Sequence, residues 1–231
     1  MGEQGIGARV LRKEDKRFLR GKGRYTDDIV LPGQAHAGFT RSPHAHAEIT
    51  SIDTSKAEKA PGVVAVLTGT DWAADEIGGM PCGFAPDGGP QNAPPRPALV
   101  ADKVRFVGDL VAMVIAESAA EAHNAAGLIE VAYDVLEANT DPAKAGDNST
   151  PLIHEEAPAN LCMSWQLGDA DATEAAFAKA TRVATVELIN NRKAPNAIEP
   201  RSSMGSYDAL SESFTLYTTS QNPHITRLLL A

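Results

Sequence analysis

The chain has 231 residues, of which 43% are hydrophobic and 5% aromatic, and a formal net charge of −9. This length is enough for one large domain or two small ones with a buried core, and the negative charge argues against a nucleic-acid partner, because phosphate binding needs a basic face. The sequence has no run of about eighteen apolar residues and no apolar signal-peptide core, so we expect a cytoplasmic protein without a membrane span.

Two cysteines, Cys82 and Cys162, lie far apart in the sequence. Two thiols cannot by themselves build a four-cysteine zinc site or ligate an iron–sulfur cluster. A disulfide between them is disfavoured in a reducing compartment. We therefore predict two ordinary thiols.

The first third of the chain predicts an extended arm followed by short strands. Pro32-Gly33 is typical of a turn, Asp53 is a suitable helix N-cap, and Pro61 ends that helix, because proline disfavours helical geometry in the residue before it. The predicted elements are, in order, an arm over 1–33, strands over 35–40 and 47–52, a short helix from Asp53 through Lys59, and a buried strand over 63–67.

The clearest unit is a strand–helix–strand block in the middle of the chain. Residues 110–116 are all apolar, which predicts a central strand. Ser118 and Glu121 have the spacing of a capping box, and the helix that follows has one apolar stripe. The predicted elements are a long surface loop over 75–97, the start of a strand over 104–108, a strand over 110–116, a helix from Ser118, and a strand over 131–135.

A polar, turn-rich stretch over 138–150 predicts a domain boundary. The elements predicted beyond it are a short helix that begins at Asp171 and includes Phe177, a long strand over 182–189, two strands over 204–207 and 214–219, and a helix that follows Pro223.

His44 and His46 are the first candidates for metal ligands. Residues two apart on a strand share a face, so both imidazoles can reach one ion. No third ligand lies nearby, and the preferred interpretation is two polar loop residues without a metal. No nucleophile is paired with a base, and the G-x-S-x-G elbow is absent. We therefore predict no catalytic residue in this chain.

Glu199 and Arg201 flank Pro200 between two predicted strands. We interpret them as a local ion pair that fixes a bend, because isolated ion pairs are common and contribute little. The alternative is a wall beside a ligand.

Gln221 lies in the turn between the last strand and the last helix. Asn222 can cap that helix and Pro223 suits its first position. A helix N-terminus presents free N–H groups and partial positive charge, and the Gln221 amide adds a donor for an oxo or phosphate-like oxygen. On these residues alone, an ordinary strand-to-helix turn remains the preferred interpretation.

Several short motifs in order along nearly the whole chain resemble the N-terminal part of the molybdenum-binding large subunit of the xanthine dehydrogenase/aldehyde oxidase family, most closely its aerobic carbon monoxide dehydrogenase type. No single motif is specific to this family, but the set of motifs taken together is. The motifs are 24–28 with 31–33, 41–47, 61–63, 67–69, 104–108, 111–112, 198–201 and 220–224.

The resemblance implies an α+β fold. It implies an N-terminal arm over 1–17, an α/β-hammerhead domain over 18–138, a linker over 139–159, and the start of the first molybdopterin-binding domain over 160–231. In the family, the glutamine matched by Gln221 hydrogen-bonds the molybdenum centre. The resemblance gives His44 and His46 no metal role.

Enzymes of this family hydroxylate small molecules, among them carbon monoxide, aldehydes and nitrogen heterocycles, at a molybdenum centre that is carried on molybdopterin cytosine dinucleotide. The resemblance implies three partners, namely the remainder of the large subunit, an iron–sulfur subunit and a flavin subunit. The family's glycine-rich cofactor loop, active-site loop and C-terminal catalytic glutamate have no counterpart here. We therefore expect a fragment that is inactive by itself. The alternative is a stand-alone, non-catalytic binding or assembly module with a hammerhead fold.

Overall fold

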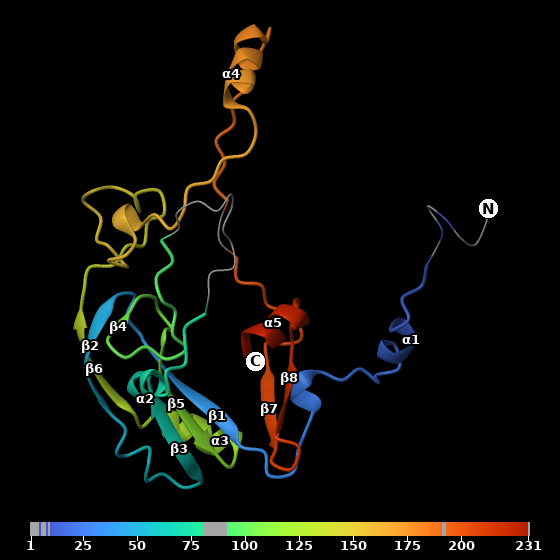
Figure 1. Ribbon diagram of the computed structural model, residues 1–231, viewed down its shortest axis with the longest axis vertical. Helices are drawn as coiled ribbons and strands as arrows, with labels where there is room; N and C mark the ends of the chain where they lie inside the picture. Colours follow the sequence, from blue (N-terminus) through green and yellow to red (C-terminus); the bar gives the residue numbers. More distant parts are fainter. Residues whose placement is uncertain (1–4, 6–7, 9, 81–91, 191–192, 231) are drawn as a thin grey trace. The chain divides into compact units, whose positions relative to one another are not determined.

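A computed structural model describes residues 5, 8, 10–80, 92–190 and 193–230 (Figure 1). The chain divides into two compact units. We call Gly33–Ala184 the core unit, and Met1–Pro32 together with Thr185–Ala231 the terminal unit. No helix among the described residues is both long and apolar enough to cross a membrane. Cys82 lies outside the described residues, and Cys162 is a free, exposed thiol.

Two three-stranded antiparallel sheets form the centre of the core unit. The first sheet has the apolar strand β5 in the middle, as predicted, because its residues are buried on both faces. The strand order is β1-β5-β3 in the first sheet and β4-β2-β6 in the second, with β1 over His36–Arg41, β2 over Ala47–Asp53, β3 over Val63–Thr68, β4 over Lys103–Val104, β5 over Leu110–Ala116 and β6 over Glu130–Val135.

Helix α3, over Ala119–Ala126, packs on the first sheet and closes the core. Ser118 caps it, since the Ser118 hydroxyl accepts a hydrogen bond from the Glu121 N–H at 3.2 Å, and the same hydroxyl donates to the Glu121 carboxylate at 2.7 Å. The predicted apolar stripe is confirmed. The buried cluster that α3 forms with its neighbours consists of Ala57, Ala112, Val114, Ala125, Ala126 and Ile129.

The helix predicted from Asp53 is wrong. Residues 55–59 form turns, in which the Asp53 carboxylate accepts from the Ser55 N–H at 2.9 Å. Nucleating a helix is costly, and six residues before a proline give too few hydrogen bonds to offset that cost. A short helix instead follows β3, namely α2 over Gly69–Ala74.

Two further predictions differ from the structure. The strand expected over 104–108 is only the two-residue β4, and the strand expected over 182–189 does not form, although these residues are described. Val186, Leu188 and Ile189 are between 72% and 87% exposed. A strand is stabilised by cross-strand neighbours, and none pairs with this segment among the described residues.

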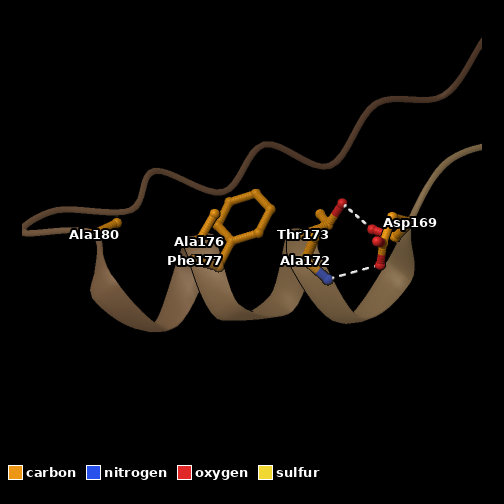
Figure 2. A pocket seen from close by; sticks show the side chains of 6 residues that line it. All are labelled: Asp169, Ala172, Thr173, Ala176, Phe177 and Ala180. Atoms are coloured by element: carbon orange, nitrogen blue, oxygen red, sulfur yellow. Dashed lines mark hydrogen bonds between the residues drawn. The ribbon is translucent and has the colours of Figure 1, made fainter.

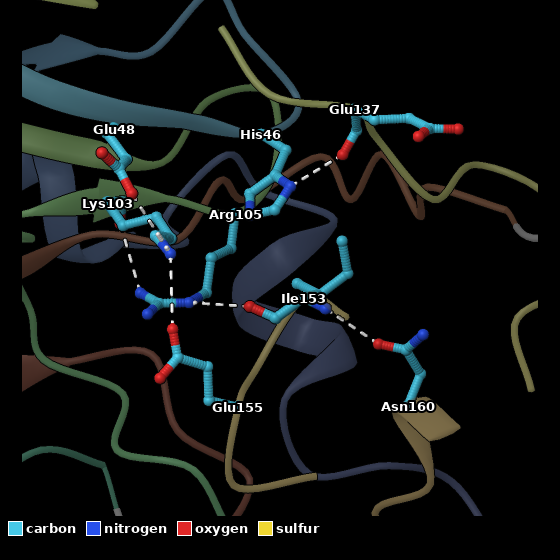
Figure 3. A network of polar contacts seen from close by, with 8 residues as sticks. All are labelled: His46, Glu48, Lys103, Arg105, Glu137, Ile153, Glu155 and Asn160. Carbon is cyan, nitrogen blue, oxygen red and sulfur yellow. Dashed lines mark hydrogen bonds and ion pairs between the residues drawn. The ribbon is translucent and has the colours of Figure 1, made fainter. Parts of the chain in front are cut away.

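The segment that follows β6 is held on the second sheet by polar contacts (Figure 3). Arg105 Nε donates to the Ile153 carbonyl at 3.1 Å, and the Ile153 N–H donates to Asn160 Oδ1 at 2.9 Å. Lys103 Nζ lies 3.9 Å from Glu155 and 3.7 Å from Glu48. This segment contains the 3₁₀ turn η3, Pro158–Asn160, and leads to helix α4, Ala170–Lys179.

The terminal unit is built on one hairpin. Strands β7, Ser203–Asp208, and β8, Ser213–Thr218, pair antiparallel in regular register and confirm the two strands predicted there. The N-terminal arm contributes one turn of helix, α1, Asp15–Phe18, and a 3₁₀ turn, η1, Thr26–Asp28, which contacts β7. Helix α5, Pro223–Leu230, follows β8.

Candidate functional site

The turn between β8 and α5 is fixed by a local hydrogen-bond network. Ser220 Oγ accepts from the Asn222 N–H at 3.1 Å and lies 3.1 Å from Thr226 Oγ1. The Thr226 hydroxyl donates to the Asn222 carbonyl at 3.1 Å, and the Thr226 N–H donates to the same oxygen at 3.0 Å. The network therefore joins the turn to the first turn of α5.

Gln221 stands in the middle of this turn with its side chain exposed. Its amide makes no hydrogen bond to any described residue, although its neighbours on both sides are bonded. The backbone N–H groups of Gln221, His224 and Ile225 are also without a backbone partner in the described chain. As predicted, Pro223 occupies the first helical position. The turn thus presents several donors beside the positive end of a helix, which suits an oxygen-rich, anionic ligand.

The hydroxyls of Ser220 and Thr226 were not predicted from the sequence. The Ser220-x-Asn222 spacing is a signal for a serine turn and points to the first of them. The contact of Ser220 with Thr226, six residues away, depends on how α5 begins, which a local pattern does not contain.

Glu199 does not form the ion pair predicted with Arg201 among the described contacts. Its Oε1 instead accepts a hydrogen bond from the Thr26 N–H at 3.1 Å, across 173 positions of sequence. The Thr26–Asp28 turn is itself fixed, because the Tyr25 N–H donates to Asp28 Oδ2 at 2.8 Å. Glu199 therefore ties the N-terminal arm to the segment before β7 within the terminal unit.

His44 and His46 lie in the segment between β1 and β2. His46 is 4% exposed and its Nδ1–H donates to the Glu137 carbonyl at 2.8 Å (Figure 3). His44 makes an edge contact with the Tyr133 ring at 5.0 Å between centroids. Burial raises the pKa of Tyr133, and its hydrogen bond with Ser42 opposes that rise. No group of three or more possible metal ligands occurs among the described residues.

A shallow groove runs along one side of α4 (Figure 2). Figure 2 shows that Asp169, its one ionisable group, is turned to the helix, where its carboxylate caps the Ala172 N–H at 2.9 Å. The groove offers methyl groups and the exposed Phe177 ring but no convergent polar groups, so it lacks the chemistry of a reaction site. It is lined by Asp169, Ala172, Thr173, Ala176, Phe177 and Ala180.

Comparison with protein families gives the class of protein. Residues 20–137 match the family model described as "Aldehyde oxidase and xanthine dehydrogenase, a/b hammerhead domain". Residues 153–231 match the molybdopterin cofactor-binding domain. The chain belongs to the aldehyde oxidase and xanthine dehydrogenase family, and the predicted family and α+β hammerhead fold are confirmed.

Individual relatives agree with this assignment. The chain is 37% identical to the carbon monoxide dehydrogenase large chain of Afipia carboxidovorans, over 99% of this chain and 29% of that protein. It is 36% identical to the nicotine 6-hydroxylase large subunit of Paenarthrobacter nicotinovorans, over 98% of this chain and 27% of the relative. The chain spans less than a third of the length of these relatives.

Solved structures also resemble this chain. The crystal structure of a Cu,Mo-CO dehydrogenase in its carbon monoxide-reduced state matches with a TM-score of 0.84 and 37% identity, over 98% of this chain and 29% of that chain. Quinoline 2-oxidoreductase from Pseudomonas putida 86 matches with a TM-score of 0.80 and 33% identity, over 98% of this chain and 28% of that chain.

Proposed function

We propose that this chain is part of the large subunit of a molybdenum hydroxylase, which oxidatively hydroxylates a small molecule at a molybdenum–molybdopterin centre. The observation that carries the proposal is the donor-rich turn at Gln221, inside the segment that matches a molybdopterin cofactor-binding domain. The names of relatives with nearly equal identity point to unlike substrates, carbon monoxide and nicotine. The proposal therefore concerns the cofactor and the class of reaction.

In this proposal the exposed Gln221 amide donates a hydrogen bond to an oxygen of the molybdenum centre. The residues of this turn suit a molybdenum centre with oxygen ligands. The Gln221 amide makes no hydrogen bond to a described residue, and three backbone N–H groups of the same turn have no backbone partner there. The molybdenum, carried on molybdopterin cytosine dinucleotide, would supply the oxidising centre when bound. The chain's own contribution is to bind and orient that centre through neutral donors, which stabilise negative oxygen atoms without a buried charge.

The proposed layout is an arm over 1–17, a hammerhead domain over 18–138, a linker over 139–159, and a molybdopterin-binding domain that begins at 160. It is supported by the two family matches, which leave 138–152 between them. Because the chain spans 29% of a 37% identical large chain, we propose that other segments of the subunit supply the base and most cofactor contacts. An iron–sulfur subunit and a flavin subunit would receive the electrons, and the 231 residues alone would be inactive.

The test is Gln221→Ala in the full-length subunit, assembled with its partners. The variant should lose one hydrogen bond to the cofactor, so turnover should fall roughly ten- to hundredfold. The Mo(V) electron paramagnetic resonance spectrum should change at the same time. The matched control is Gln166→Ala, which removes another exposed amide and should change neither quantity.

An unchanged spectrum and unchanged turnover in Gln221→Ala would contradict the assigned role of Gln221. A purified full-length protein that contains no molybdenum would contradict the proposal that the chain is part of a molybdenum hydroxylase. That result would favour the other hypothesis, a non-catalytic binding or assembly module.

A further inference from the structure

Thr226 makes one contact beyond those usual for a threonine near the start of a helix. Thr173 in α4 shows the usual arrangement, in which the hydroxyl donates to the carbonyl of the residue four positions earlier, Asp169, at 2.7 Å. The Thr226 hydroxyl makes the same kind of bond, to the Asn222 carbonyl at 3.1 Å. In addition, Thr226 Oγ1 lies 3.1 Å from the Ser220 hydroxyl. This second contact joins α5 to the turn that precedes it.

The protons of these groups can be assigned, because each hydroxyl has a single one. A carbonyl oxygen can only accept, so the Thr226 hydroxyl uses its proton on the Asn222 carbonyl. The bond between the two hydroxyls is therefore donated by Ser220. The Ser220 oxygen in turn accepts the Asn222 N–H at 3.1 Å. The three bonds form a closed ring that starts at the N–H of Asn222 and returns to the C=O of the same residue.

This ring holds both polar groups of the Asn222 backbone. Since a peptide group is planar, fixing the Asn222 N–H also fixes the Gln221 carbonyl, which lies in the same plane. The next residue, Pro223, has a φ angle that is fixed by its own side-chain ring. The backbone on the C-terminal side of Gln221 therefore has little freedom left.

The backbone on the N-terminal side of Gln221 is held by β7. The Thr219 N–H donates to the Ser202 carbonyl at 3.3 Å. One residue earlier, Thr218 Oγ1 lies 2.7 Å from Ser203 Oγ. Gln221, whose amide makes no hydrogen bond to a described residue, thus lies between two segments whose positions are fixed by hydrogen bonds.

A fixed backbone at Gln221 is useful for the function proposed above. A hydrogen-bond donor stabilises developing charge best when it does not have to reorganise during the reaction. A glutamine on a loose turn would lose backbone entropy each time it bound an oxygen of the molybdenum centre. The ring removes that part of the cost before the cofactor binds, and it does so with neutral groups.

We propose that Thr226 is a positioning residue of the cofactor site, which acts through Ser220 and the Asn222 backbone to hold Gln221 in place. The inference rests on the proposed role of Gln221 and assigns Thr226 no contact with the cofactor. All members of the ring lie within 220–226, so the ring does not depend on other segments of the subunit.

The experiment compares Thr226→Val with Thr226→Ser in the full-length subunit, assembled with its partners. Valine keeps the branched shape of threonine and nearly its helix propensity but has no hydroxyl, whereas serine keeps the hydroxyl. Thr226→Val should lower turnover roughly three- to tenfold and change the Mo(V) electron paramagnetic resonance spectrum. Thr226→Ser should keep the turnover and the spectrum of the wild type.

The matched control is Thr173→Val in α4. Thr173 and Thr226 are each the fourth residue of their helix, and each hydroxyl donates to the carbonyl four positions earlier. The control therefore removes the same local bond at the start of a helix that has no part in the proposed cofactor site. It should change neither turnover nor the spectrum.

Hydrogen exchange tests the ring independently of turnover. In the assembled complex, the Asn222 amide should exchange faster in Ser220→Ala, which removes its acceptor. It should also exchange faster in Thr226→Val, because the Ser220 hydroxyl then loses the acceptor that orients it. Thr226→Ser should keep the wild-type rate. Mass spectrometry of peptides that cover 220–227 measures these rates, and an unchanged rate in Thr226→Val would overturn the proposal.

A double variant, Gln221→Ala with Thr226→Val, tests whether Thr226 acts through Gln221. Once the amide is absent there is less to position, so the combined loss of turnover should be clearly smaller than the product of the two single losses. A combined loss equal to that product would overturn the proposal, because the two residues would then act independently.

The single variants separate this inference from the proposed function. If Gln221→Ala lowers turnover and Thr226→Val does not, the positioning role is overturned while the cofactor role of Gln221 stands. If neither variant changes turnover or the spectrum, both roles are overturned. A loss in Thr226→Ser or Thr173→Val as large as that in Thr226→Val would also overturn the positioning role, because the Thr226 hydroxyl would not be the cause.

Discussion

Gly38 lies in the middle of β1 at the point where the backbone of α3 comes closest. A Cβ atom at this position would meet the Ala122 carbonyl oxygen at 2.3 Å and the Ala122 carbonyl carbon at 2.6 Å. Both are backbone atoms, which cannot rotate away as the end of a flexible side chain would. The absence of a side chain at Gly38 therefore allows α3 to pack directly on the first sheet.

We predict that Gly38→Ala lowers the free energy of unfolding of the protein by about 1 to 3 kcal/mol, because the added methyl group forces α3 away from β1. Urea denaturation measures the change. The matched control is Gly205→Ala in β7, where nothing lies within 4 Å of the new Cβ. It should leave stability unchanged or raise it slightly, since alanine restricts the unfolded chain. Equal losses of unfolding free energy in the two variants would show that replacing any strand glycine is destabilising, and that the close approach of the Ala122 backbone to Gly38 is not the cause.

The residues of the candidate site were predictable to different degrees. The exposed Gln221 amide follows from a strand-to-helix turn with proline at the first helical position, which local signals indicate. The partner of Glu199 did not follow from the sequence. Its contact with Thr26 spans 173 positions, and the nearby Arg201 offered a local explanation that the structure does not support. Long-range contacts of this kind depend on the whole fold.

At the scale of elements, the two capped helices α3 and α4 differ in what they pack against. Ser118 caps α3, whose residues Ala122, Ala125 and Ala126 are buried. Asp169 caps α4, in which every residue is exposed. The two caps offer similar hydrogen bonds, at 3.2 Å and 2.9 Å. Most of the stability of a helix in a protein comes from tertiary packing, so the same local change should have unequal consequences.

We expect Ser118→Ala to lower the free energy of unfolding by about 1 kcal/mol, the usual cost of losing an N-cap. Asp169→Ala should instead increase the amide exchange rates within α4 and leave the urea midpoint unchanged. Each variant is the control for the other, and hydrogen exchange together with urea denaturation measures both effects. A global loss of stability in Asp169→Ala as large as that in Ser118→Ala would contradict the view that α4 is energetically separate.

The strands show where sequence patterns succeed and where they fail. The apolar segment 110–116 forms the central strand, because partners on both sides, β1 and β3, lie within the same unit. The segment 182–189 is also rich in β-branched and aliphatic residues, yet it forms no strand. Strand propensity expresses how side chains fit a sheet, and it has no effect without a neighbouring strand. The pattern therefore predicts the tendency of a segment, and the surrounding chain decides the outcome.

At the scale of the whole molecule, residues 151–160 are attached to the second sheet of the core unit by polar contacts, and this segment contains the titratable group His154. The pKa of His154 is lowered, first because burial disfavours the charged imidazolium and second because the Arg105 charge is close. Glu156 acts in the opposite direction and raises it. The folded state therefore binds the His154 proton less readily than the unfolded chain does.

This difference sets the sign of the pH dependence. Above the ordinary histidine pKa of about 6.5, both states are neutral at His154 and the group contributes no pH dependence. As the pH falls through about 6.5, the unfolded state takes up the proton first and becomes relatively more stable. The attachment of 151–160 should consequently weaken between about pH 7 and the lower pKa of the folded state.

We predict that His154→Gln removes part of this weakening, whereas Glu156→Gln increases it, because the second change deletes the carboxylate that favours the imidazolium. The measurement is the hydrogen-exchange protection factor of the Ile153 amide, which is bonded to Asn160 at 2.9 Å and reports opening of the segment. Protection should fall least with decreasing pH in His154→Gln, more in the wild type, and most in Glu156→Gln. The same slope in all three proteins would show that His154 does not govern the attachment. The reverse order would mean that the folded state binds the proton more tightly than the unfolded chain, against the desolvation that the burial of His154 requires.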